Sequence, residues 1–414
     1  MENQIVSNLN HPGTLEKLYR ENKAAFTRVF KQLYPTIQEN PTAQVWYERL
    51  NYSEEGINWG TRKDFIFISV AVFLAGLIAK IPDLTGLEPD YFYQRNIAFV
   101  VFPFLSAYFA WKQQLTLVRM LPVVIVFLLS AVYINLLPVN LSSDTLILAC
   151  IHLPLFLWSL LGYTFTGCSF QEVAKRLDFL RFNGDLAVMG AVIVIAGILF
   201  TGISFNLFQL IGLDIEQFYA HYVVIWGGAA IPIVATFIVR TNPQLVSKVS
   251  PVIALVFTPL VLVFLIIYLI AMAYTGKDPY NDREFLLIFN VLLIGVMAII
   301  LFSVAEAPKE GGRRATPLVL LLLAVVTILV NGIALSAIVF RISEWGITPN
   351  RLAVLGGNVL ILTNLLIVAY KLYRTIIRQG DLAQVENSIA RFLPVYVLWS
   401  GIVAFLFPLL FGFR

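Results

Sequence analysis

Long apolar runs separated by short polar stretches dominate the chain from residue 65 onward. A bilayer core of about 30 Å is crossed by about 20 apolar residues in helical form, because a helix satisfies its own backbone polar groups. Runs close to this length occur at about 65–81, 97–111, 121–137, 145–165, 186–210, 218–239, 251–274, 285–304, 317–340, 352–370 and 393–411. The pattern predicts an all-α fold, a polytopic transmembrane helical bundle of about 11 spans. The second run is short, so ten spans is the alternative.

The lysine and arginine residues predict the orientation of these spans. With eleven spans and an inner N-terminus, 22 of the 29 basic residues fall in the N-terminal segment and the inner loops. Two of the predicted outer loops, 138–144 and 212–217, contain no basic residue. Cytoplasmic loops of membrane proteins carry an excess of lysine and arginine. We therefore expect a cytoplasmic N-terminus and an outer C-terminus.

Composition narrows the class of protein further. The 414 residues are 59% hydrophobic and 13% charged, with a mean hydropathy of +0.80, whereas a soluble domain is about half apolar and a quarter charged. Disordered, coiled-coil, collagen-like and disulfide-rich secreted proteins are excluded. The net charge of +4 lies on a chain with little soluble surface, so we expect membrane lipids and no nucleic acid as partners.

Residues 1–60 are the only segment of soluble character, and residues 61–414 are predicted to form the membrane domain. Thr14 can cap a helix that continues to about Tyr34, and a second helix is expected at about 42–50. Because one or two helices bury little core alone, the segment is predicted to be a cytoplasmic amphipathic helical arm. It would dock on the membrane domain, lie on the lipid surface or bind a protein partner. Residues 171–181 predict a separate short interfacial helix whose basic side chains face anionic lipid.

Ionisable and polar residues inside the predicted spans are candidate functional residues, since a charge there costs roughly 2.5–3.5 kcal/mol on insertion scales. His152 is the clearest. A hydrogen bond to a neighbouring helix or to the carbonyl freed by Pro154 would satisfy it, and a proton-relay or ligand role is the alternative. Glu306 closes its span before a basic loop with which it can pair. Asn364 can bond a neighbouring helix or line a polar pocket.

The sequence contains no arrangement typical of catalysis or of cofactor binding. Its three histidines and two cysteines lack metal-ligand spacing, and it has no phosphate-binding glycine-rich loop and no nucleophile motif. We expect no enzyme activity, no metal and no cofactor. An intramembrane enzyme would require His152, Glu306 or Arg351 to converge in one cavity.

Two stretches together resemble a known family. Ile342-Ser-Glu-Trp-Gly-Ile-Thr-Pro-Asn-Arg351 opens the tenth predicted span, and Arg240-Thr-Asn-Pro243 leads into the seventh. They resemble the bacterial membrane family catalogued as domain of unknown function 4153, whose members share an I-S-E-aromatic-G-x-T-x-N-R segment. The resemblance covers about residue 186 to the C-terminus, and the N-terminal arm together with residues 59–63 looks like an extension found in Bacteroidetes-type members. It implies a multi-pass protein of the bacterial inner membrane, and it carries over no catalytic residue.

The first of these stretches also has a physical interpretation. Arg341 and Glu344 are three residues apart and can pair on one helical face. The Thr348-Pro349 dipeptide suits an N-cap and a first helical residue, which places Asn350 and Arg351 in the first turn. A cation there opposes the helix dipole. We therefore expect an anionic partner for Arg351, either Glu344 or a lipid or solute phosphate, with interfacial snorkelling as the alternative.

These features favour two functions. Prolines inside spans, Gly-Gly steps and neutral asparagines are typical of the broken helices that bind solutes in transporters. Because buried charge is scarce, a transport-like protein that handles lipid or a neutral solute is favoured over an ion-coupled carrier. The alternative is a membrane-anchored regulatory or scaffold protein that engages a cytoplasmic partner through residues 1–60.

Overall fold

The computed structural model describes residues 1–51, 58–138, 143–169, 172–211, 213–246, 249–275, 280, 283–306, 315–378 and 382–413. These residues are mostly helical and include no strand, so the all-α prediction is confirmed. The chain divides into two compact units, Met1–Trp59 and Gly60–Arg414. Each unit has its own apolar core.

The first unit contains four helices, α1 (Glu2–Ser7), α2 (Pro12–Glu21), α3 (Lys23–Ile37) and α4 (Pro41–Asn51). The second predicted helix is confirmed as α4. The first was wrong in extent, because Asn22 interrupts it and caps α3 by accepting a hydrogen bond from the Ala25 amide at 3.1 Å. The expectation of little core was also wrong, since four helices together bury one. Its members are Ile5, Leu9, Leu15, Phe26, Phe30, Leu33, Ala43 and Trp46.

In the second unit, nine helical segments of the described residues are long and apolar enough to cross a membrane, by length and composition. They correspond to the third to eleventh predicted spans. The chain is therefore a multi-pass membrane protein by this criterion. The segments are α8 (Leu117–Leu136), α9 (Asp144–Phe165), α10 (Val173–Leu210), α11 (Glu216–Phe218) with η1 (Tyr219–Val224) and α12 (Ile225–Thr241), η2 (Pro243–Leu245) with α13 (Ser250–Thr275), α14 (Arg283–Ala305), α15 (Ala315–Trp345), α16 (Pro349–Arg378), and α17 (Ala383–Gly401) with η3 (Ile402–Leu406) and α18 (Phe407–Leu410).

Two further helices, α5 (Arg62–Ala79) and α7 (Pro89–Lys112), form at the first two predicted spans, with the short α6 (Ile81–Thr85) between them. They pack in the same unit, but charged or polar residues occupy part of each helix. α5 begins with three charged residues, and α7 carries Gln94, Arg95 and Asn96 in its first half. The choice between ten and eleven spans and the cytoplasmic N-terminus stay predictions.

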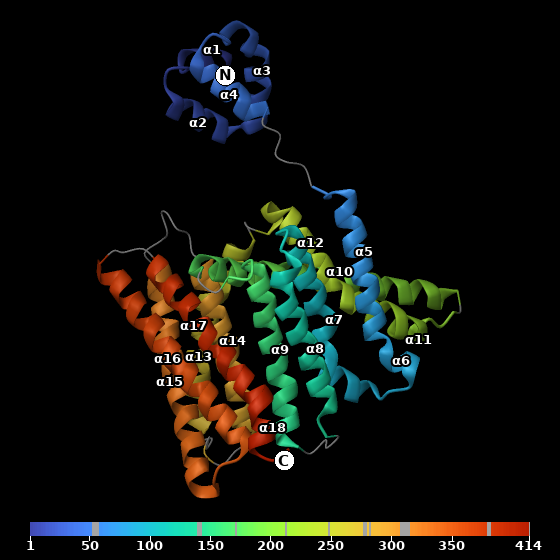
Figure 1. Cartoon of the computed structure of the whole chain (residues 1–414). Helices are drawn as coiled ribbons and strands as arrows, with labels where there is room; N and C mark the ends of the chain where they lie inside the picture. Colours follow the sequence, from blue (N-terminus) through green and yellow to red (C-terminus); the bar gives the residue numbers. More distant parts are fainter. Residues whose placement is uncertain are drawn as a thin grey trace. The chain divides into compact units, whose positions relative to one another are not determined.

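The predicted interfacial helix at 171–181 is not separate from the span that follows it. The structure has one continuous helix, α10, from Val173 to Leu210, because no proline interrupts the stretch between the two predicted segments. Gly184 lies inside it and allows close packing, since a Cβ there would lie 2.0 Å from the ring of Phe302. In Figure 1, α10 runs crosswise to α8 and α9. Its first third holds its buried residues, Leu177, Phe179 and Phe182.

Helix α9 is central to the second unit. Its C-terminal half joins a core with α5, α7, α10 and α12, and its N-terminal half joins a core with α7, α8 and η3. A third core is formed by α13, α14, α15, α16 and α17. The two ends of α9 therefore face different groups of helices, and each end carries an arginine-containing site described below.

Candidate functional site

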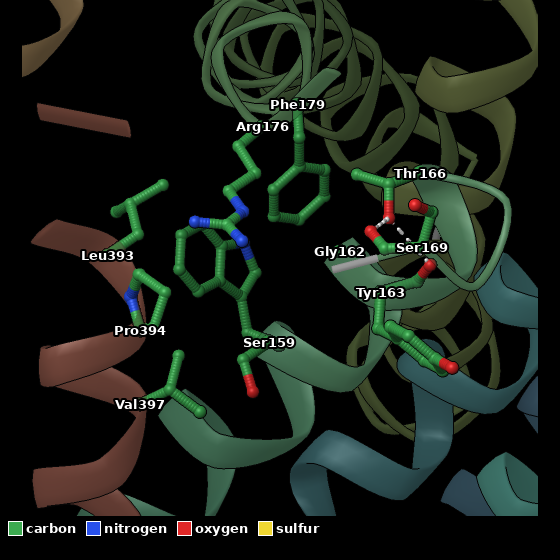
Figure 2. Close-up of a pocket in the computed structure, with 11 residues that line it drawn as sticks. Ser159, Gly162, Tyr163, Thr166, Ser169, Arg176, Phe179, Leu393, Pro394 and Val397 are labelled. Carbon is green, nitrogen blue, oxygen red and sulfur yellow. Dashed lines mark hydrogen bonds between the residues drawn. The ribbon is translucent and has the colours of Figure 1, made fainter. Parts of the chain in front are cut away.

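A mostly apolar pocket of about 140 Å³ lies between the C-terminal half of α9, the start of α10 and the second half of α17. Trp158 and Phe179 form one side of it, with their ring centroids 5.0 Å apart. Leu393, Pro394 and Val397 line the side that α17 contributes (Figure 2). One cationic side chain, Arg176, is part of the lining.

The position of Arg176 depends on a proline of α17. Pro394 has no backbone N–H, so the carbonyl of Ala390, four residues earlier, lacks its helical donor. The Nη1 of Arg176 donates to this carbonyl at 3.3 Å. Figure 2 shows the guanidinium between Phe179 and the α17 residues. Pro394 thus leaves the Ala390 carbonyl without a helical donor, and this carbonyl holds Arg176 at the pocket.

At another part of the pocket wall, α9 and α10 pack closely, and the end of α9 contributes hydroxyl groups. A Cβ on Gly162 would lie 2.7 Å from the ring of Phe179, so α9 and α10 can meet here only over a glycine. The Oγ1 of Thr166, the residue that follows α9, lies within hydrogen-bond distance of the carbonyls of Tyr163 at 2.9 Å and Ser169 at 3.0 Å. The pocket therefore has an apolar interior and a polar edge at the end of α9.

Next to the pocket, Arg181 joins the ends of three helices. Its Nε donates to the carbonyl of Ala305 at the end of α14, 2.7 Å away. Its Nη2 lies 3.1 Å from Glu386 of α17, a carboxylate that is only 6% exposed. Its Nη1 lies 3.1 Å from Asp178 on its own helix. Glu386 is therefore a buried carboxylate whose charge is balanced by Arg181.

Glu306, one residue past α14, belongs to the same cluster. Burial is the main cause that raises the pKa of Glu306 to about 7. The neighbouring carboxylates of Asp185 and Glu386 also raise this pKa, and the positive charge of Arg181 lowers it. Asp185 itself accepts a hydrogen bond from the Ser250 hydroxyl of α13 at 2.6 Å. The basic loop predicted to pair with Glu306 lies outside the described residues.

The raised pKa predicts a pH-dependent contribution of Glu306 to stability. Its ordinary pKa is 4.5, so between pH 4.5 and about 7 the folded state binds the proton more tightly than the unfolded state. Stability from this group is thus full below pH 4.5 and is lost as the pH rises through about 7. We expect Glu306→Gln to raise the thermal unfolding midpoint relative to the wild type at pH 8, and to change it little at pH 5. The exposed Glu344→Gln is the control, and an equal change at both pH values for Glu306→Gln would contradict the expectation.

His152 and Asn364 have different kinds of hydrogen-bond partner. The Nδ1 of His152 lies 2.9 Å from the carbonyl of Leu148 in its own helix. The predicted bond to a neighbouring helix or to the carbonyl freed by Pro154 was therefore wrong, because the carbonyl one turn back is within reach. Asn364 is fully buried and donates from α16 to the Tyr396 hydroxyl of α17 at 3.0 Å. The expected interhelical bond of Asn364 is confirmed.

The predicted pairing of Arg341 with Glu344 was wrong. Arg341 is 8% exposed, and its Nε donates to the carbonyl of Tyr280 at 2.9 Å, while Glu344 is exposed. The guanidinium also lies 5.5 Å from the Trp345 ring centroid. Packing against a neighbouring loop and ring therefore decides the orientation of Arg341, rather than the helical spacing.

Arg351 has backbone partners and does not pair with Glu344, one of the two anionic partners expected from the sequence; a lipid or solute phosphate stays a prediction. Its Nη1 donates to the carbonyls of Trp345 at 2.8 Å and Gly346 at 2.7 Å, at the C-terminus of α15. The free carbonyls and the negative dipole end of α15 stabilise the positive charge of Arg351. They offset its unfavourable interaction with the positive dipole end of α16. The predicted cap is confirmed, since α16 begins at Pro349 and the Thr348 hydroxyl accepts from the Arg351 amide at 3.3 Å. Asn350 lies half-buried in the first turn.

The structure does not bring Glu306 and Arg351 together. They lie at opposite ends of α15, a helix of 31 residues, which spans roughly 46 Å at 1.5 Å per residue. Among the described residues, no group of three or more histidine, cysteine, aspartate or glutamate residues could hold a metal ion.

The pocket residues were not recognised in the sequence. Arg176 had been assigned to lipid contact on a separate helix, and the sequence carries one usable signal for its true partner. That signal is Pro394, which predicts a free carbonyl at Ala390 but does not say which donor reaches it.

Comparisons with protein-family models, curated proteins and solved structures found no match to the chain. The resemblance described from the sequence stays a prediction.

Proposed function

We propose that this protein is a lipid-handling, transport-like membrane protein of the bacterial inner membrane, and that the pocket between α9, α10 and α17 binds part of an anionic lipid. The observation that carries the proposal is the combination of an apolar cavity with Arg176 in its wall. The arginine suits a phosphate or carboxylate oxygen, and the apolar interior suits a hydrocarbon segment.

The size of the pocket supports a lipid over a small neutral solute. Sites that enclose a drug-sized ligand have volumes of about 300–1,000 Å³, whereas this pocket has about 140 Å³. A cavity of about 150 Å³ lined by apolar side chains accommodates a group the size of a benzene ring. The pocket therefore fits a segment of a larger molecule whose remainder lies outside it.

The level of the pocket in the bundle also supports a lipid. It lies where α9 ends and α10 begins, beside residues 393–397 in the middle of α17. Helix ends lie near the headgroup region when helices of this length span a bilayer. By the orientation predicted from the basic residues, this is the cytoplasmic side. A lipid could therefore place its headgroup at Arg176 and a hydrocarbon segment beside Trp158 and Val397.

The test is lipid retention by the purified full-length protein, measured by native mass spectrometry. We expect Arg176→Gln to weaken retention of phosphatidylglycerol about tenfold, since charge-assisted hydrogen bonds contribute about 1.5–3 kcal/mol. Val397→Trp, which fills the cavity, should reduce retention in the same way. A wild-type protein that retains no lipid after delipidation would overturn the proposal.

Matched controls lie on the same two helices. Lys175 neighbours Arg176 but pairs with Glu172 at 2.9 Å, and the exposed Val395 neighbours Val397 without lining the pocket. Lys175→Gln and Val395→Trp should leave lipid retention unchanged. If these controls weaken retention as much as the pocket variants, the lipid binds elsewhere.

The scaffold function is a second candidate, favoured by one observation. Residues 1–59 form a compact unit with its own core, and a surface groove in that unit is lined by Trp46, Arg49 and the exposed Val45. A protein subunit that is retained by the full-length chain and lost on deletion of residues 1–59, with no retained lipid, would favour this candidate.

A further inference from the structure

Arg95, in the second turn of α7, is a buried arginine with incomplete hydrogen bonding. Only 2% of the Arg95 surface is exposed. The Nε donates to the carbonyl of Ile134 in α8 at 3.2 Å, and the guanidinium lies 4.1 Å from the ring centroid of Tyr91. The Nη1 and Nη2 atoms are buried and have no hydrogen-bond partner.

The described partners of Arg95 are uncharged groups, the Ile134 carbonyl and the Tyr91 ring. Next to Arg95 in the chain, Asn96 forms two side-chain hydrogen bonds with Asn135, of 2.8 and 3.0 Å. Each amide group donates to the amide oxygen of the other residue. On the α9 side, the Cys150 thiol is close enough to be influenced by the charge of Arg95. None of the ion pairs among the described residues includes Arg95.

This arrangement is energetically unfavourable as it stands. A guanidinium does not deprotonate in proteins, so burial cannot neutralise it. Its two Nη atoms carry four of its five N–H donors, and each buried donor without an acceptor costs about 1–3 kcal/mol. A buried charge without a counter-charge is more costly still. Among the described residues, no carboxylate forms an ion pair with Arg95 that could offset these costs.

We propose that Arg95 is the cation of an anion-binding site between α7, α8 and α9. The ligand is an oxyanion that presents two oxygens to the Nη1 and Nη2 atoms, as a phosphate group does. Tyr91 and the Ile134 carbonyl fix the plane of the guanidinium, and the Asn96–Asn135 pair fixes α7 against α8. The site is at the other end of α9 from the Arg176 pocket, and it does not rest on the proposed function.

The level of the site fits both a phospholipid headgroup and a free phosphate. Ile134 lies two residues before the end of α8, which is about 3 Å along the helix axis. Ile97, Val132 and Leu136 are exposed apolar residues on the adjoining turns of α7 and α8, and they can contact acyl chains. Both ligand sources present the same phosphate oxygens to Arg95.

The experiment measures the thermal unfolding midpoint of the full-length protein under two kinds of anion addition. In one arm, inorganic phosphate is added to protein in neutral detergent. In the other, phosphatidylglycerol replaces part of the phosphatidylcholine in nanodiscs. We expect a rise in the wild-type midpoint that is lost in Arg95→Met, with the apparent affinity for the anion at least about tenfold weaker. Without anion, Arg95→Met should unfold at the same or a higher temperature than the wild type, because it removes an uncompensated charge.

Arg351→Met is the matched control. Arg351 lies at the same end of the bundle, where Ala353 of α16 packs with Leu148 of α9, and its Nη1 already donates to two carbonyls. This variant should keep the anion-dependent rise. Arg95→Lys, which keeps the charge but loses the planar fork, should bind the anion more weakly than the wild type.

The outcomes separate the two ligand sources. A rise with phosphate alone assigns the site to a free anion, and a rise only with phosphatidylglycerol assigns it to a headgroup. No rise in the wild type, or an equal rise in Arg95→Met, would overturn the proposal. If Arg95→Lys binds the anion as tightly as the wild type does, the anion does not present two oxygens to the guanidinium.

Discussion

Replacement of Arg181 by methionine is expected to lower the free energy of unfolding by about 3–5 kcal/mol, the usual cost of leaving one partner of a buried ion pair alone. The variant would leave the Glu386 carboxylate, 6% exposed, without its cation. It would also remove the donor to the Ala305 carbonyl at the end of α14. Unfolding of the purified protein by SDS in mixed micelles measures the effect.

A second variant and a control separate this loss from a general effect of changing α10. The double variant Arg181→Met with Glu386→Leu removes both charges, and it should recover part of the lost stability. Lys175→Met breaks an ion pair between half-exposed side chains on the same helix, and it should change stability by less than about 1 kcal/mol. If Arg181→Met costs no more than Lys175→Met, the Glu386 carboxylate does not depend on Arg181.

Replacement of Gly356 by valine is expected to destabilise the packing of α16 against α17 by about 3 kcal/mol. A Cβ at this position would lie 2.0 Å from the Trp399 ring, and insertion of atoms into a packed core costs about 1–3 kcal/mol or more. The ring has little freedom to move, because it also packs edge-to-face on Phe407 with centroids 5.9 Å apart. The same SDS titration measures the loss.

The adjacent glycine provides a direct control. No atom lies within 4 Å of a Cβ built on Gly357, so Gly357→Ala should be neutral or raise stability by up to about 1 kcal/mol through helix propensity. The companion variant Gly356→Ala should destabilise despite the same gain in propensity. Trp399→Ala combined with Gly356→Val should restore part of the loss. Equal effects of alanine at the two glycines would show that Trp399 does not restrict this position.

The polar sites of the membrane unit are built mainly on backbone carbonyls. Arg176 bonds the carbonyl freed by Pro394, Arg181 bonds the end of α14 and Arg351 bonds the end of α15. Each of these arginines uses an acceptor that a helix leaves open at its end or at a proline. Arg95 also bonds a carbonyl, near the end of α8, but its Nη atoms have no acceptor. This difference supports an external ligand at Arg95.

The sequence by itself determined the helices and some of their ends. Apolar runs of span length specify helices locally, because a segment in lipid must satisfy its backbone within itself. The Thr348-Pro349 start of α16 followed from capping chemistry, which involves only neighbouring residues. Glu306 was recognisable as a candidate because a carboxylate at the end of an apolar run is itself unusual.

Only the tertiary structure decided what surrounds those residues. The partners of Arg176 and Glu386 come from elements more than 200 residues away in the chain, and no local spacing encodes such contacts. The core of residues 1–59 was missed because it depends on which apolar faces of the four helices pack together. The burial of Arg95 was missed because its partner, the Ile134 carbonyl, lies on α8, 39 residues away in the chain. Local chemistry therefore specifies the helices of this protein, and packing between distant helices decides which of their polar groups gain a partner.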